Sequence, residues 1–242
     1  MNKQSNIYTI IYIIVVVVIV SAALSITATA LKPKQTANAN ADKMRQILFS
    51  IGVAPQSNDV IATFGKTITE QLLVNSKGDV VARVEAGSDD TTVFDTDVAS
   101  EINKPAAERQ LPVFVANTVA GVKYIIPVYG AGLWGPIWGY VALDANGSTI
   151  YGAYFSHSSE TPGLGAEIEK PQFSDQFQGK DLYKAGKFLP VEVVKAGQKP
   201  ADADADYVNG VSGGTITSKG VGSMLDNCLR PYASFLSTLN KQ

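Results

Sequence analysis

The longest hydrophobic stretch of the sequence lies near its N-terminus, from Ile7 to Leu31. A helix rises about 1.5 Å per residue, so this stretch is long enough to cross a hydrocarbon core of about 30 Å with some tilt. Tyr8 and Tyr12 stand near one end, as aromatic residues at a membrane interface often do. The pattern predicts a transmembrane helix over 7–31, preceded by a short tail over 1–6.

A cleaved signal peptide is the alternative for this stretch, because Ala28-Thr29-Ala30 fits a small-x-small cleavage pattern. However, Lys3 is the only cation before the stretch, and the stretch exceeds the usual length of a signal peptide's apolar region. We therefore favour a retained anchor.

The side of the membrane on which the following domain lies stays open at this point. Four cations follow the stretch and favour a cytoplasmic domain, but long domains cross a membrane largely regardless of charge. These cations are Lys32, Lys34, Lys43 and Arg45.

The residues after the anchor predict a linker over 32–41 and then a single domain over 42–242. Asn40 or Asp42 is suited to cap a helix that runs through Ser50 and ends at Gly52. Short segments rich in β-branched and aromatic residues then predict strands. These segments are 72–84 (two strands around a turn), 111–116, 121–129, 138–143, 149–155 and 189–194.

Apolar residues at helical spacing follow between Met224 and Leu239, with an interruption at Pro231. Strands joined as hairpins, with helices near both ends, differ from the alternating strands and helices of a parallel sheet. The predicted fold class is therefore α+β: one N-terminal transmembrane helix, followed by a largely antiparallel sheet with flanking helices.

The amino-acid composition argues against several classes of function. The 242 residues carry a formal net charge of −2, so no basic face for nucleic acid is expected. Cys228 is the only cysteine, which rules out an intramolecular disulfide, and one cysteine with one histidine cannot form a four-ligand zinc or iron–sulfur site. Asp89, Asp90, Asp95 and Asp97 lack the spacing of an EF-hand and predict a solvated loop. We expect no metal site, and any redox cofactor must be organic or shared with another subunit.

Candidate chemistry concentrates at Ser212-Gly213-Gly214-Thr215-Ile216-Thr217-Ser218-Lys219-Gly220. The glycines allow close approach of a ligand, and a helix starting with Thr217 or Ser218 as N-cap would offer free N–H groups to a phosphate. The alternative is an ordinary turn that caps the last helix.

Two further segments carry glycines beside aromatic or ionisable residues. Residues 130–140 contain both tryptophans of the chain and suit either a turn before a core strand or a flat conjugated ligand. In residues 157–168, His157 and Glu160 are a conceivable general-base pair. No G-x-S-x-G nucleophile accompanies them, so a hydrolase is poorly supported and no catalytic residue is assigned.

The segment SGGT resembles the flavinylation motif Ser/Thr-Gly-Ala-Thr of the FMN-binding domain family. That resemblance implies FMN joined through its phosphate to Thr215. Two residues depart from the family pattern: Gly214 replaces its alanine, and Asn209 replaces an aspartate three residues before the serine.

Other segments occur in the family order: GLWGPIWG, then H-x-x-E-T-P-G-L-G, then Phe173 to Lys180, then SGGT. Together with the anchor, they resemble the C subunit of sodium-translocating NADH:quinone oxidoreductases. The homologous G subunit of the Rnf-type ferredoxin:NAD oxidoreductase is the nearest alternative.

This resemblance implies a cofactor site. Thr161, Gly163, Leu164 and Gly165 would lie against the isoalloxazine ring, with Glu160 and His157 holding their loop in shape. Leu133 or Trp134 would cover the ring. The remaining expected site residues surround the phosphate: Ser212, Gly213, Gly214, Thr217 and Lys219.

The implied function is a relay of single electrons between an iron centre and the FMN of the neighbouring B subunit. The implied partners are the other members of a six-subunit complex, especially its B, D and E subunits, and a magnesium-dependent flavin transferase. The resemblance also implies a place in the cell inner membrane, with the domain on the periplasmic face. Two alternatives come from other classes: a tethered ligand- or partner-binding module without redox activity, and an anchored hydrolase using His157 and Glu160.

Overall fold

The computed structural model describes residues 6–240, which form two compact units. One unit ends at Lys43 and the other begins at Met44. The first helix, α1, runs over Asn6–Ser50. Its apolar part is long and hydrophobic enough to cross a membrane, and none of that part is buried. α1 is therefore a candidate membrane span.

Contrary to the prediction from the sequence, the helix does not end after the hydrophobic stretch. The sequence predicted a linker over 32–41 and a new helix near Asn40 or Asp42, whereas α1 continues without interruption and contains Pro33. Proline in a helix interior removes one hydrogen bond and costs about 3 kcal/mol. The following lysine, glutamine and alanine residues are good helix formers, which explains why the helix persists beyond the proline.

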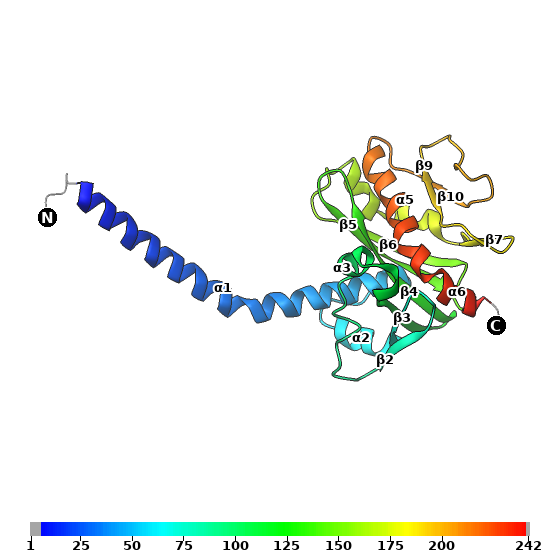
Figure 1. Ribbon diagram of the computed structural model, residues 1–242, viewed down its shortest axis with the longest axis horizontal. Coiled ribbons are helices and arrows are strands. Elements are labelled where there is room, and N and C mark those ends of the chain that lie inside the picture. The colour runs from blue at the N-terminus through cyan, green and yellow to red at the C-terminus, as the bar shows by residue number, and fades with distance from the viewer. Residues whose placement is uncertain (1–5, 241–242) are drawn as a thin grey trace. The chain divides into compact units, whose positions relative to one another are not determined.

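The second unit is built on one six-stranded sheet in which every neighbouring pair is antiparallel. The strand order is β2-β1-β3-β4-β5-β6 (Figure 1). The strands are β1 Ile68–Val74, β2 Val80–Glu85, β3 Leu111–Thr118, β4 Gly121–Ala131, β5 Pro136–Asp144 and β6 Ile150–His157. The expected α+β class with a largely antiparallel sheet is confirmed.

Shorter elements complete this unit. Among the described residues they include a two-stranded antiparallel pair, β7 with β8, and a parallel pair, β9 with β10. Their bounds are β7 Tyr183–Lys184, β8 Lys187–Phe188, β9 Glu192–Val194 and β10 Tyr207–Asn209. The α-helices are α2 Val60–Thr67, α3 Val98–Asn103, α4 Pro171–Ser174, α5 Thr215–Leu229 and α6 Ala233–Leu239. The 3-10 helices are η1 Ala106–Glu108, η2 Gly165–Glu169, η3 Asp175–Phe177 and η4 Arg230–Tyr232.

Alternation along the central strands gives the sheet two buried faces. On one face, Phe114 and Ile125 pack in a cluster that includes Ile47 and Leu48 from the last turns of α1. On the other face, neighbouring strand residues such as Ile126 pack with residues of α5 and α6. Figure 1 shows α5 and α6 lying along this second face. The sheet is thus covered on both sides, and α5 is fixed against it.

α5 begins earlier than the sequence predicted. Its N-cap is Gly214, and the N–H of Ser218 donates to the carbonyl of Gly214 at 2.9 Å. The expected caps, Thr217 and Ser218, are buried inside the first turn. Their hydroxyls bond to groups in other segments, so they are not available as caps. Thr215 is consequently the first residue of the helix.

One helical glycine allows α5 to approach the sheet closely. A Cβ on Gly220 would clash with the carbonyl oxygen of Ala131 at the end of β4. A Cβ on Gly222, two residues along the same helix, would meet Val193 at 3.5 Å, which is ordinary contact. A side chain at position 220 would therefore push α5 away from β4, whereas one at position 222 fits without a clash, although both residues stand in the helix interior.

We expect Gly220→Ala to lower the free energy of unfolding by about 1–3 kcal/mol, because the clash with backbone outweighs the helix propensity of alanine. Gly222→Ala is the matched control and should raise it by about 0.5–1 kcal/mol, since alanine favours the helix and meets no clash. Urea denaturation followed by circular dichroism measures both. Equal stability of the two variants would contradict the close approach of α5 to β4.

Candidate functional site

A cleft of about 410 Å³ lies where three segments of the second unit meet. The segments are the connection between β4 and β5, the loop after β6, and the start of α5. The cleft is lined by Leu133, Trp134, Glu160, Thr161, Leu164, Gly165, Gly213, Gly214, Thr215, Ile216 and Thr217. The tertiary structure thus brings together residues from positions 133 to 217 that stand in separate motifs of the sequence.

Large apolar side chains border this cleft and face solvent. Trp134 is 66% exposed and Ile216 is 57% exposed, and Leu133 and Leu164 are also exposed. Exposed apolar groups gathered around a hollow mark a ligand or partner site. Ile216 was missed from sequence. The available signal was its place outside the buried stripe of α5, which includes Val221 and Leu225.

Three of the expected site residues lie outside the cleft. Gly163 adopts a φ of +76° and donates its N–H to Glu167 Oε1 at 3.0 Å, so it shapes the loop. Ser212 and Lys219 line a neighbouring groove of about 490 Å³, together with Lys195 and Lys199.

Thr215 is the point where the two hollows meet. Together with Gly213, it lines both the cleft and the lysine-lined groove. Its side chain is exposed at the first position of α5. A group attached there would have an apolar cleft on one side and cations on the other.

Glu160 holds the three segments of the cleft together. Its side chain is buried, although it is a carboxylate. Oε1 accepts the backbone N–H of Trp134 at 2.8 Å, and Oε2 accepts the hydroxyl of Thr217 at 2.5 Å. One carboxylate therefore links the β4–β5 connection, the loop after β6 and the first turn of α5.

Two glycines make room for this carboxylate. A Cβ on Gly132 would lie 2.5 Å from Glu160 Oε1, and a Cβ on Gly165 would clash with Oε2. Gly213 has a φ of +77°, and a Cβ there would lie 2.6 Å from the side chain of Leu164. The close approach of the two loops to α5 therefore requires glycine at these positions.

Burial acts to raise the pKa of Glu160, but its donors act in the opposite direction and prevail. The Thr217 hydroxyl, the N–H groups of Trp134 and Leu133, and His157 together lower the pKa below its usual value. Hydrogen bonds to a carboxylate favour its charged form. Glu160 is therefore ionised at neutral pH.

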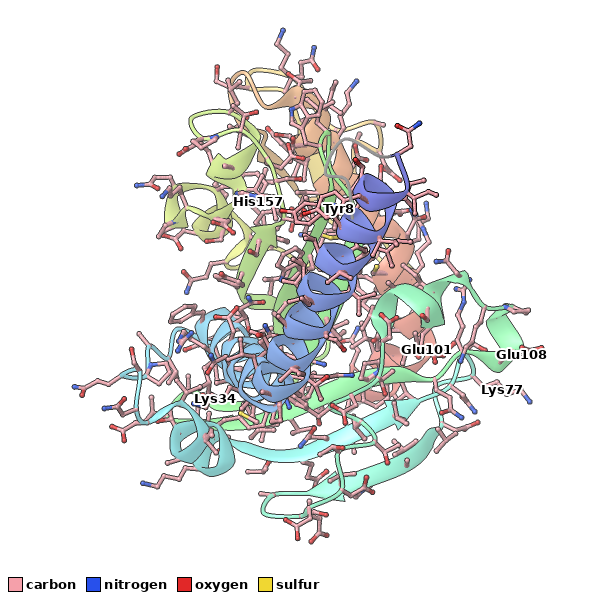
Figure 2. All side chains as sticks on the ribbon, turned by 90° about the vertical axis from the view of Figure 1, so that its left-hand side faces the viewer. Tyr8, Lys34, Lys77, Glu101, Glu108 and His157 are labelled. Carbon is pink, nitrogen blue, oxygen red and sulfur yellow. The ribbon has the colours of Figure 1, made fainter. Side chains whose placement is uncertain are left out.

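His157 and Glu160 do not form the general-base pair that a hydrolase would need. Nδ1 of His157 accepts the backbone N–H of Glu160 at 3.1 Å, while the carboxylate of Glu160 bonds to Trp134 and Thr217. Nε2 of His157 also lies 3.8 Å from Oε2 of Glu169. Figure 2 shows His157 on the domain well apart from Glu101 and Glu108. The histidine supports the loop after β6.

No metal-binding group of acidic, histidine or cysteine side chains occurs within residues 6–240. In the acidic loop, Asp90 accepts bonds from Thr92, and Asp97 caps α3 by accepting the N–H of Ala99 at 3.1 Å. In residues 201–206, where aspartate alternates with alanine, Asp206 pairs with Lys184 at 3.1 Å. These carboxylates thus bond to a turn, a helix start and a distant segment of the chain.

The FMN-binding domain family matches residues 132–230, which include every residue that lines the cleft. The chain is similar to the C subunit of the Na(+)-translocating NADH-quinone reductase of Pseudomonas aeruginosa. The two are 32% identical over 216 residues, which cover 83% of each chain.

Two solved structures are also similar. The C subunit of the same reductase from Parabacteroides distasonis is 48% identical, with a TM-score of 0.76 over 86% of this chain and 97% of that one. The NqrC protein of Shewanella oneidensis is 28% identical, with a TM-score of 0.66 over 85% of this chain and 100% of that one. With its cleft inside the matched domain and most of its length covered by these relatives, this chain belongs to the NqrC family, the C subunits of the Na(+)-translocating NADH-quinone reductase.

Proposed function

We propose that this chain carries FMN covalently on Thr215 and relays single electrons as the C subunit of a sodium-translocating NADH:quinone reductase. The observation that carries the proposal is the environment of Thr215. It is the exposed first residue of α5 and opens onto a cleft lined by exposed apolar side chains. A phosphoester requires an accessible hydroxyl, and a flat conjugated ring requires apolar walls.

The neighbouring hydroxyls are less suited to accept a flavin. Thr217 is 1% exposed and donates to Glu160, and Ser218 is buried and accepts the N–H of Val211 at 2.8 Å. Ser212 is exposed but lines the groove and not the cleft. This difference in burial and hydrogen bonding favours Thr215 over Thr217.

The surroundings of Thr215 suit a bound phosphate. It lies at the N-terminus of a helix, where free N–H groups and the helix dipole favour an anion. Lys219 follows four residues later, so it lies on the same side of α5 as Thr215. Both residues line the groove. Lys219 would hold the phosphate by charge, as the sequence suggested.

The residues of the cleft fit the flavin ring. Bound FMN would supply the redox chemistry, and this chain would orient it and set its polarity. Leu133, Trp134, Leu164 and Ile216 would exclude water from the ring. Within the described part of the chain, the exposed Thr161 hydroxyl makes no hydrogen bond, so it is free to donate to a polar edge of the ring.

The two departures from the family motif are compatible with this role. A Cβ on Gly214 would lie 3.1 Å from the carbonyl of Leu164, so glycine lets the loop lie close to α5. Asn209 contributes through its backbone: its N–H donates to the side chain of Gln176 at 3.0 Å, and its carbonyl accepts from that side chain at 3.2 Å. Neither contact depends on a carboxylate at position 209.

The wider role follows from the family. The relatives are named as subunits of a sodium-translocating oxidoreductase, and α1 suits a membrane anchor. We propose that electrons pass from an iron centre to this flavin and on to the FMN of the neighbouring B subunit. The B, D and E subunits would be the main partners, and the chain would cross the inner membrane once with its domain on the periplasmic face. A magnesium-dependent flavin transferase would modify Thr215.

Thr215→Val should abolish flavin attachment, because the variant keeps the shape of the side chain and loses the hydroxyl. The chain is co-expressed with a flavin transferase, and intact mass with peptide mapping measures the addition of FMN less one water. Thr215→Ser should still be modified, and Thr217→Val is the matched control that should retain the adduct. An adduct on Thr217 in the unmutated chain would contradict the choice of acceptor.

Trp134→Ala should raise the fluorescence yield of the attached flavin several-fold, because an indole in contact with the ring quenches it. The other tryptophan provides the control: Trp138 Nε1 donates to Gln46 at 2.9 Å, and Trp138 does not line the cleft. Trp138→Phe should leave the yield near that of the unmutated chain. Equal quenching in all three proteins would place the ring outside this cleft.

A further inference from the structure

We propose that the charge of Glu160 lowers the midpoint potential of the flavin held in the cleft. The inference rests on the proposed function and adds to it a residue that sets how readily this chain accepts an electron. Glu160 also links the three segments of the cleft. Its charge and this link predict different effects of substitution on the flavin potential.

The placement of the carboxylate is the first support. Glu160 is the only ionisable side chain among the described residues that line the cleft. It is 5% exposed, and Gly132 and Gly165 leave the space that its two oxygens occupy. The fold therefore holds a negative charge in the cleft wall at a fixed position.

The hydrogen bonds of the carboxylate are the second support. Trp134 and Thr217 each donate to it, and these bonds keep it in the charged form. Both donors border the cleft themselves. The charge is thus tied to the walls that would surround the ring.

The effect on an electron acceptor follows from electrostatics. Uptake of an electron adds negative charge to the occupant of the cleft, and a fixed negative charge nearby opposes it. The opposition is stronger where the surroundings exclude water. The groove beyond Thr215 contains Lys195, Lys199 and Lys219, which act in the opposite direction. These lysines are exposed, so solvent screens them more strongly than it screens Glu160.

Glu160→Gln separates the charge from the structural link. The glutamine carbonyl can accept the N–H of Trp134, and its amide can donate to the hydroxyl of Thr217. The shape and both contacts are retained, and only the negative charge is removed. Glu160→Asp keeps the charge and shortens the side chain.

The experiment is a redox titration of the full-length chain with covalently attached FMN, followed by flavin absorbance at neutral pH. We expect Glu160→Gln to raise the equilibrium constant for uptake of one electron at least tenfold, which is a rise of 59 mV. Glu160→Asp should remain close to the unmutated chain. Glu108→Gln removes the same charge at an exposed site, where the side chain makes no hydrogen bond or ion pair in the described structure. This control should leave the potential unchanged.

Thr217→Val provides a second variant that keeps the charge and removes one of its donors. It should lower the potential, because the carboxylate loses a hydroxyl donor that offsets its charge. This is the opposite direction from Glu160→Gln, and the variant serves as the test if Glu160→Gln does not take up flavin. A rise or no change in Thr217→Val, or an unchanged potential in Glu160→Gln, would overturn the inference. Absence of flavin from the unmutated chain would instead refute the proposed function.

Discussion

The buried carboxylate of Glu160 is the contact on which the candidate site depends. Three segments that are far apart in sequence meet at its two oxygens: the β4–β5 connection, the loop after β6, and the start of α5. A buried carboxylate is costly unless donors satisfy it, and here backbone and hydroxyl donors do so. The same contact orients α5 so that Thr217 faces inward and Thr215 faces outward.

The sheet provides the rigid frame for this contact. Covered on both faces, it fixes the ends of β4, β5 and β6 relative to α5. Gly220 lets α5 lie directly on the end of β4, so the helix start has little freedom to move. A site assembled from loops is thereby held by elements with a packed core, which favours a preorganised cleft.

The site combines features with opposite electrostatic effects. An apolar cleft with one buried negative charge lies on one side of Thr215, and a groove with three lysines lies on the other. An attached phosphoflavin would have its ring and its phosphate in different surroundings. This separation is a physical reason for a helix N-terminus to stand between the two hollows, since free N–H groups suit the phosphate.

The sequence alone determined the long apolar helix, the strands and the class of the fold, because these follow from local periodicity and composition. It also identified the motifs at 133–134, 160–165 and 212–219 through their resemblance to a family. It erred at two helix boundaries, and the reasons differ: helix-forming residues after Pro33 continue α1, whereas tertiary contacts set the start of α5. α1 passes through Pro33, and α5 starts at Thr215 because the hydroxyls of Thr217 and Ser218 are used elsewhere. Only the tertiary structure showed that the carboxylate of Glu160 joins these motifs and that Ile216 belongs to the cleft, whereas the role of His157 in its loop was already expected from the resemblance. Such contacts join residues tens of positions apart, and no local pattern encodes them.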